Sequence, residues 1–164
     1  MRRALRFGSL VFGLLLSSTV SAAGLDAVFA MQMPDAKGQA VAFSQYRGKP
    51  LLLHFWAPWC VPCQAGQLDL RALQAVNRVR GLQVLSIAVV HEGEMQGALA
   101  QSCQPGVPLV YDKKKAIWLM QSLGHVSAEL PFTLLLDAQG TVRLRQTGLV
   151  SPAELDAALK ALSR

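Results

Sequence analysis

Charged residues are scarce in this sequence: Asp, Glu, Lys and Arg make up 16% of its 164 residues, whereas 52% are hydrophobic. No stretch is dominated by polar or low-complexity sequence, which excludes a disordered chain outside the termini. No internal repeat occurs at the periods of solenoid proteins, which excludes a repeat array. What remains is a globular chain, long enough to bury the core of one domain but hardly of two.

A basic patch of the kind that binds nucleic acid is also missing. The formal net charge is +6, but Arg2, Arg3 and Arg6 carry three of the positive charges, and no acidic residue precedes Asp26. The whole chain has 16 basic and 10 acidic residues, so 13 and 10 remain without these arginines. The resulting charge of +3 contributes to solubility and is not a footprint for phosphates.

The N-terminus has the pattern of a signal peptide. An apolar run, Leu10 to Leu16, follows the three arginines, and Val20-Ser21-Ala22 fits a cleavage site before Ala23. Because residues 7–25 carry no charge and are long enough to span a bilayer, an uncleaved anchor is the alternative.

Both alternatives place the folded part outside the cytoplasm, in the periplasm or an equivalent compartment, where thiols meet an oxidising environment. We therefore expect a signal peptide over residues 1–22 and one domain over residues 23–164.

Predicted strands and helices alternate along the domain. Residues 27–43 alternate weakly and break at residues 34–38, as in a short hairpin. Strands are predicted over residues 51–56, 82–90, 107–111, 132–136 and 142–146, and helices over residues 60–80, 94–101, 114–123 and from 152 onward, after a capping box at Ser151 and Glu154. Alternating strands and helices require a parallel sheet with helices on both faces, and the late hairpin makes that sheet mixed. The predicted fold class is therefore α/β.

The motif Cys60-Val61-Pro62-Cys63 carries the strongest chemical signal. Two cysteines at this spacing, at a helix start, can bring their Cα atoms within disulfide range, roughly 4.4–6.8 Å. Unpaired N–H groups at the helix start favour a thiolate on Cys60. Cys63 lies one turn deeper, so we expect Cys60 to attack a partner disulfide and Cys63 to resolve the mixed disulfide. Pro62 loses no hydrogen bond in a first turn.

The neighbours Trp56 and Trp59 are expected to surround the cysteines with apolar groups that limit solvent access. Two other uses of the pair are a structural disulfide and half of a zinc site. A bridge over so short a loop restrains little chain entropy. Zinc needs four ligands, and the sequence has no second CxxC and no HxxxH pair. A strand that leads directly into CxxC and a helix favours redox chemistry without a metal.

The segment around the cysteines resembles the active-site segment of thioredoxins, on the residues Phe55-Trp56-Ala57-Pro58-Trp59-Cys60-Val61-Pro62-Cys63. Residues 43–50, 130–137 and 148–159 are similar, more narrowly, to TlpA/ResA-type exported thioredoxins, and the likeness covers nearly all of residues 27–162. It implies a thioredoxin fold, with a central mixed sheet, helices on both faces and the hairpin as an N-terminal extension. It also implies an enzyme that handles disulfides of exported proteins, often as a reductant in cytochrome c maturation or copper-site assembly.

The same resemblance assigns further site residues. Pro131 corresponds to the cis-proline packed against the disulfide, and Leu130 to the residue that offers its backbone to substrate; a trans proline at a strand start is the alternative. His54 occupies the position of a buried proton acceptor, so it is a candidate base for Cys63, and a neutral hydrogen-bonded histidine is the alternative. The chain departs from the family at Gly66 and Leu68, where members carry an acidic residue and a proline.

Other polar residues receive smaller roles. His91 and His125 are taken as residues of solvated loops, with a partner contact as the alternative, and Cys103 is left outside the chemistry.

We expect no cofactor beyond the Cys60–Cys63 disulfide. The expected partners are exported proteins with thiols or disulfides and a membrane or periplasmic protein that recharges the pair, with no nucleic acid and a monomeric chain. Reduction is expected from the resemblance. Oxidation or isomerisation of disulfides is the enzymatic alternative, and a Cu(I)-handling module is the non-enzymatic one.

Overall fold

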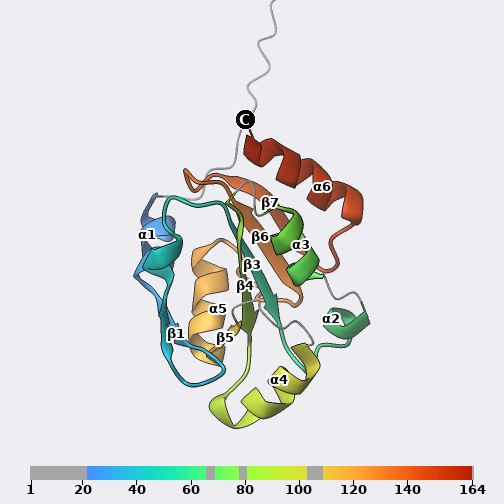
Figure 1. The fold of residues 1–164 in the computed structure, drawn as a ribbon. Coiled ribbons are helices and arrows are strands. Elements are labelled where there is room, and N and C mark those ends of the chain that lie inside the picture. The colour runs from blue at the N-terminus through green and yellow to red at the C-terminus, as the bar shows by residue number, and fades with distance from the viewer. Residues whose placement is uncertain (1–21, 66–68, 78–80, 103–108, 164) are drawn as a thin grey trace, which may run out of the picture.

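A five-stranded mixed sheet forms the centre of the protein (Figure 1), in the order β5-β4-β3-β6-β7. The structure is a computed structural model and describes residues 22–163 except 66–68, 78–80 and 103–108. The strands are β3 (Leu51–Trp56), β4 (Gln83–Ala88), β5 (Leu109–Tyr111), β6 (Phe132–Leu136) and β7 (Val142–Thr147). β3, β4 and β5 are parallel, whereas β6 pairs antiparallel with both β3 and β7. The predicted mixed sheet is confirmed.

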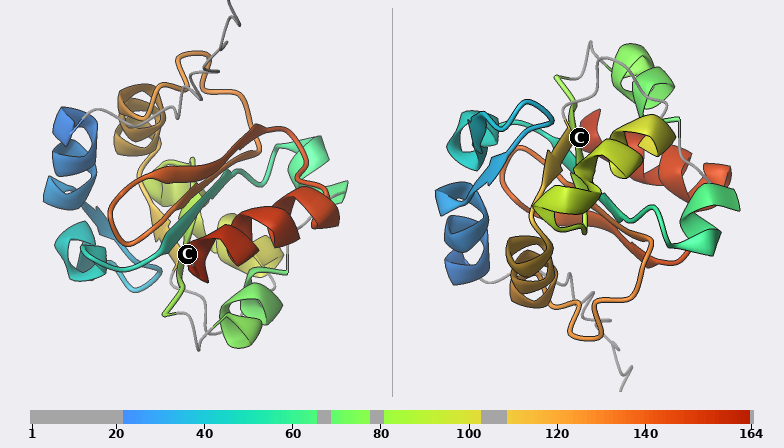
Figure 2. Two further views of the ribbon diagram at one scale, coloured as in Figure 1. Left: turned by 90° about the horizontal axis from the view of Figure 1, so that it is seen from above. Right: turned by 90° about the horizontal axis from the view of Figure 1, so that it is seen from below.

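Helices cover both faces of this sheet (Figure 2). They are α1 (Ala22–Ala30), α2 (Val61–Ala65), α3 (Leu70–Val76), α4 (Met95–Ser102), α5 (Lys113–Ser122) and α6 (Pro152–Lys160). Leu52 of β3 belongs to a buried cluster with Leu70 of α3 and Leu155 of α6. Its neighbours Leu51 and Leu53 belong to the cluster that includes α1 and α5. β3 is therefore apolar on both faces because both are covered.

The N-terminal hairpin is also confirmed. β1 (Gln32–Pro34) pairs antiparallel with β2 (Ala40–Ala42), and the Asp35 carboxylate accepts hydrogen bonds from the backbone of Lys37 and Gln39 in the turn between them. An isolated bridge between Asp35 and Val110 places this hairpin beside β5, at one edge of the sheet.

Residues 27–30 are helical, which the weakly alternating pattern did not indicate. They end α1, whose Val28 and Phe29 are buried in the main core. The guanidinium of Arg47 lies 4.7 Å from the centre of the Phe29 ring and 3.1 Å from the carboxylate of Asp26. Contacts with a distant segment thus support this helix, and a local pattern does not contain them.

The predicted helix 60–80 is wrong as a single element. α2 ends at Ala65, and α3 begins after Asp69, whose carboxylate accepts a 2.8 Å hydrogen bond from the N–H of Ala72. A side-chain cap of this kind starts a new helix, because it satisfies an N–H group that the first turn leaves unpaired.

The predicted signal peptide, residues 1–22, lies outside the described residues except for its last one, and it stays a prediction. Among the helices that the structure describes, none is both long and apolar enough to cross a membrane.

Candidate functional site

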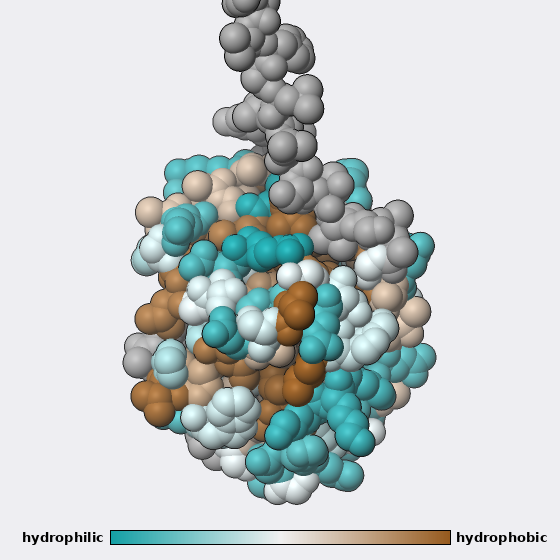
Figure 3. Space-filling model, turned by 180° about the vertical axis from the view of Figure 1, so that it is seen from behind, coloured by the Kyte–Doolittle hydropathy of each residue, from teal (hydrophilic) through white to brown (hydrophobic). Residues whose placement is uncertain are grey.

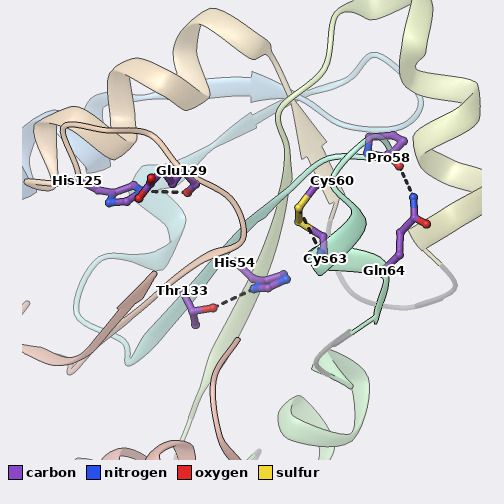
Figure 4. The surroundings of a disulfide bond; sticks show 8 residues. All are labelled: His54, Pro58, Cys60, Cys63, Gln64, His125, Glu129 and Thr133. Atoms are coloured by element: carbon purple, nitrogen blue, oxygen red, sulfur yellow. Dashed lines mark hydrogen bonds between the residues drawn. A yellow bond between two sulfur atoms is a disulfide. The ribbon is translucent and has the colours of Figure 1, made fainter. Parts of the chain in front are cut away.

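The cysteine pair lies where β3 ends and α2 begins (Figure 4). A turn follows β3, in which the N–H of Cys60 donates to the carbonyl of Ala57 at 3.1 Å. Cys60 and Cys63 form a disulfide with their Cα atoms 5.2 Å apart. Both residues are buried, with 5% and 3% of their surface exposed. The spacing therefore produces the predicted disulfide, with Pro62 inside the first turn of α2.

The sulfur of Cys60 receives a backbone hydrogen bond. The N–H of Cys63 donates to this Sγ at 3.2 Å. In the reduced protein, a donor held at this position favours the thiolate of Cys60 over the thiol, because hydrogen bonding to the charged form lowers a pKa. α2 has only five residues. The stabilising contact is thus this N–H group rather than the dipole of a long helix.

The cis-proline loop lies at the same end of the sheet as the cysteines, where β3 ends and β6 begins; this end is called the cysteine edge below. The Leu130–Pro131 bond is cis, as predicted, and Pro131 is buried. The next residue, Phe132, pairs with Phe55 near the end of β3, and the carbonyl of Pro131 accepts a 2.8 Å hydrogen bond from Gly148. The antiparallel pairing of β3 with β6 therefore brings residues 130–131 to the cysteine edge. The binding of substrate by this loop stays a prediction.

His54 is buried below the disulfide. Its Nδ1 lies 3.0 Å from Oγ1 of Thr133, its partner across the β3–β6 register. In Figure 4 the imidazole lies between Thr133 and Cys63. Burial lowers its pKa from 6.5 to about 4, so the ring is neutral at pH 7. At this pKa the imidazole is a weak acceptor for a thiol proton, and the role of His54 as base for Cys63 stays a prediction.

The two tryptophans differ in their surroundings. Trp56 is buried, and its indole N–H donates to the hydroxyl of Ser86 at 2.8 Å. Trp59 is 58% exposed, whereas Cys60 and Cys63 are 5% and 3% exposed, and the expectation that Trp59 limits solvent access to the cysteines stays a prediction. It follows the end of β3, in the turn that the bond from Cys60 to Ala57 closes.

Trp59 belongs to an apolar surface at the cysteine edge. The exposed large apolar residues of the described chain are Trp59, Val61, Trp118, Val126 and Leu149. All but Trp118 come from the cysteine segment, the loop before Pro131 or the residue after Gly148. Apolar side chains reach the surface in the space-filling view from behind (Figure 3). Exposed apolar groups around a reactive pair fit contact with another protein.

A hollow of about 400 Å³ opens next to this edge, between the N-terminal hairpin and the ends of β4 and β5. Pro34, His91, Tyr111 and Lys113 are among the residues that line it. His91 is exposed, as expected of a solvated loop, and its backbone N–H is held by the carboxylate of Glu94 at 2.8 Å. No three His, Cys, Asp or Glu side chains cluster as metal ligands within the described ranges. Cys103 lies outside those ranges.

Two residues near the site were not predicted correctly from sequence. His125 is buried rather than solvated, and no sequence pattern marks the buried Thr133 as a partner of His54. The signal for Thr133 is the register of β3 against β6, which pairs residues 79 positions apart.

Comparison with known proteins decides the family. The model of the AhpC/TSA family matches residues 25–145. This chain belongs to that family. It is 26% identical over 130 residues to the thiol-disulfide oxidoreductase ResA of Geobacillus kaustophilus. This alignment covers 79% of this chain and 72% of the relative. The chain is also 29% identical over 121 residues to the thiol:disulfide interchange protein DsbE of Escherichia coli K12. That alignment covers 71% of this chain and 59% of the relative.

A solved structure shows the same fold. A secreted disulfide oxidoreductase of Mycobacterium tuberculosis superposes with a TM-score of 0.66 at 23% identity, over 84% of this chain and 99% of the other. The predicted thioredoxin fold is thus confirmed. The predicted enzyme class, a thiol–disulfide oxidoreductase, is confirmed by the named relatives together with the Cys60–Cys63 pair at disulfide distance.

Proposed function

We propose that this protein is exported and reduces disulfides of extracytoplasmic proteins through Cys60 and Cys63. The observation that carries the proposal is the Cys60–Cys63 disulfide at the same sheet edge as the cis Leu130–Pro131 bond. The N-terminal sequence supports export, and the resemblance to TlpA/ResA-type proteins supports reduction. Proteins of cytochrome c maturation are the substrate class that this resemblance favours.

The reaction follows from the positions of the two sulfurs. The Cys60 thiolate attacks one sulfur of the substrate disulfide, which forms a mixed disulfide and releases the other substrate sulfur as a thiolate. Cys63 then loses its proton and attacks the Cys60 sulfur. This step forms the Cys60–Cys63 disulfide, releases the second substrate thiolate and completes the transfer of two electrons. A dithiol partner in the membrane or periplasm returns the pair to its reduced state, and no prosthetic group takes part.

Substrate selection belongs to the surface around the pair. Leu130 is half-buried beside Pro131 and presents its backbone at the start of β6. An extended substrate segment can form main-chain hydrogen bonds with this backbone ahead of β6. The exposed Trp59, Val61 and Val126 provide apolar contacts on either side.

Trapping with Cys63→Ser tests this function. The variant cannot resolve the mixed disulfide, so exported proteins should accumulate covalently on Cys60 and be released by a reductant. The matched control is Cys60→Ser/Cys63→Ser, which should trap none. If Cys63→Ser captures no more protein than this control, the proposed chemistry is wrong.

The trapped proteins also indicate direction. Partners that carry a disulfide in the absence of this protein support reduction, whereas partners that lack one support oxidation. Cu(I) added without oxygen to the reduced protein tests the metal-handling alternative, which requires stoichiometric binding.

A further inference from the structure

His125 is a buried histidine in the loop that leads to the cis-proline. α5 ends at Ser122, and the loop runs from Leu123 to Pro131. Only 7% of His125 is exposed. Its imidazole stacks on the ring of Phe132, with the ring centres 4.2 Å apart and the planes 7° from parallel. Phe132 in turn contacts Phe55 of β3, with ring centres 5.6 Å apart. The loop is therefore anchored to the central strand through stacked rings.

The imidazole also forms a hydrogen bond across the loop (Figure 4). Its Nε2 lies 2.9 Å from the backbone carbonyl of Glu129, four residues along the chain. A carbonyl can only accept, so Nε2 carries the proton and donates. Its Nδ1 lies 3.5 Å from the hydroxyl of Thr147 at the end of β7, which can donate to it. Both nitrogens thus contact segments next to the substrate-binding residues.

The backbone of this loop needs such support. Ala128 has a φ of +52°, in the left-handed region that residues with a Cβ rarely adopt. One backbone hydrogen bond, from Ala128 to the carbonyl of His125 at 3.3 Å, closes the turn. The hydrogen bond from the His125 side chain to the carbonyl of Glu129 spans the same turn and ends one residue nearer to Pro131.

The consequence falls on Leu130. The Glu129 carbonyl is turned toward His125, whereas the backbone N–H and C=O of Leu130 make no hydrogen bond within the described part of the chain. Unpaired backbone groups next to a strand start can accept an extended segment of another chain. The direction in which they point depends on the loop conformation between His125 and Pro131.

We propose that His125 is a positioning residue for protein substrates. It holds the Glu129 carbonyl inward, and it thereby fixes the Leu130 backbone in the orientation that pairs with a substrate chain. The inference rests on the proposed function, because it concerns how the same site receives its substrate. This role predicts that His125 affects only substrates that pair with the Leu130 backbone. A small disulfide reacts with Cys60 without such pairing and does not need His125.

The test uses two probes that differ in this requirement. The rate at which reduced Cys60 reacts, in the Cys63→Ser background, is measured with oxidised insulin as the protein disulfide and with 5,5′-dithiobis(2-nitrobenzoate) as the small one. His125→Phe keeps a ring for Phe132 but removes the donor to Glu129. We expect a loss of about tenfold with insulin, the size of one hydrogen bond, and less than about a twofold change with the small disulfide.

Rescue distinguishes positioning from a general effect on folding. His125→Gln places an amide donor at the distance of Nε2 and should retain at least about half of the insulin rate, whereas His125→Asn is too short and should behave like His125→Phe. This pair also decides the matter if His125→Phe does not fold. Gln121→Ala, an exposed change in the last turn of α5 just before this loop, is the control and should leave both rates unchanged.

Equal losses with both probes, or no loss with either, would overturn the role of His125. A parent protein that reacts with the small disulfide but not with insulin would also count against it. If Cys60 of the parent protein reacts with neither probe, the proposed function itself fails.

Discussion

At the scale of single residues, the chemistry depends on two sulfurs and on the groups that contact them. The N–H of Cys63 donates to the sulfur of Cys60, and His54 lies below the pair as a neutral ring. The low pKa of His54 weighs against the base role that its position suggests. To accept the proton of a thiol with a pKa near 8.5, an imidazole with a pKa of about 4 would work against a difference of about 6 kcal/mol.

We therefore expect His54→Asn to resolve mixed disulfides at a rate within about threefold of the parent protein at pH 7. The asparagine amide can still reach the hydroxyl of Thr133, so the packing below the disulfide is kept. Stopped-flow measurement of the decay of a mixed disulfide on Cys60 checks this. A loss of more than about a hundredfold, of the size expected for general base catalysis, would restore His54 as the base.

Sequence alone predicts the reactive residues but not their partners. The cysteine motif is a local feature, so Cys60 and Cys63 could be predicted from it, whereas the cis bond at Pro131 was expected only from the resemblance to TlpA/ResA-type proteins. The contact of His54 with Thr133 depends on strand register, and the inward position of His125 depends on Phe132 and Glu129. A pattern in one segment does not contain this information.

At the scale of elements, helix starts are marked by side chains that cap them. Asp112 accepts the N–H of Lys115 at the start of α5. At the start of α6, the hydroxyl of Ser151 accepts the N–H of Glu154 at 3.2 Å, and the Glu154 carboxylate accepts the N–H of Ser151 at 3.1 Å. This capping box is the one that the sequence predicts.

Replacing Ser151 by alanine should lower the free energy of unfolding by about 1 kcal/mol, because one N–H of the first turn of α6 loses its acceptor. Urea denaturation of the oxidised protein measures this change. Ser44→Ala is the control, because Ser44 is exposed and its short helix has no side-chain cap. It should change the free energy of unfolding by less than about 0.5 kcal/mol. Equal effects of the two substitutions would show that the cap does not stabilise α6.

Elements were predictable where burial alone determines them. β3 and β6 have the predicted bounds, since a buried strand of a covered sheet is apolar throughout. The helix break at Asp69 was missed because the apolar spacing continues past the cap, and α1 was missed because its support comes from Arg47 and from α5.

At the scale of the whole molecule, burial of His54 links stability to pH. In the unfolded chain a histidine binds a proton near pH 6.5, whereas the folded protein binds it at this site only near pH 4. Between these values the unfolded state holds more protons, so stability rises with pH and is fully present above about pH 6.5.

On lowering the pH from 6.5 to 4, this linkage should remove up to about 3 kcal/mol from the free energy of unfolding. Urea denaturation at pH 7, 5.5 and 4 for the parent protein and His54→Asn isolates the contribution, since both lose the other acid-sensitive contacts alike. The parent should lose more stability than the variant over this range. Parallel curves would mean that His54 titrates normally in the folded state.

The architecture was predictable at this scale because the order of strands and helices restricts the topology. The hairpin, the parallel strands and the final antiparallel pair could all be placed in order. The position of the hairpin beside β5 could not, because its bridge joins Asp35 to Val110 across 75 residues.

The edge strand β7 has a consequence for how copies of this protein meet. Its residues alternate between partly buried and exposed positions, with Arg143 and Arg145 on the exposed side. Arg143 is ion-paired with Asp137, with Nη2 and Oδ2 2.8 Å apart, whereas Arg145 has no ion pair among the described residues. Two copies that met edge to edge would have to bury the charge of Arg145, which is costly. The strand that completes the sheet thus also opposes its extension into aggregates, even though its backbone is unpaired along one side.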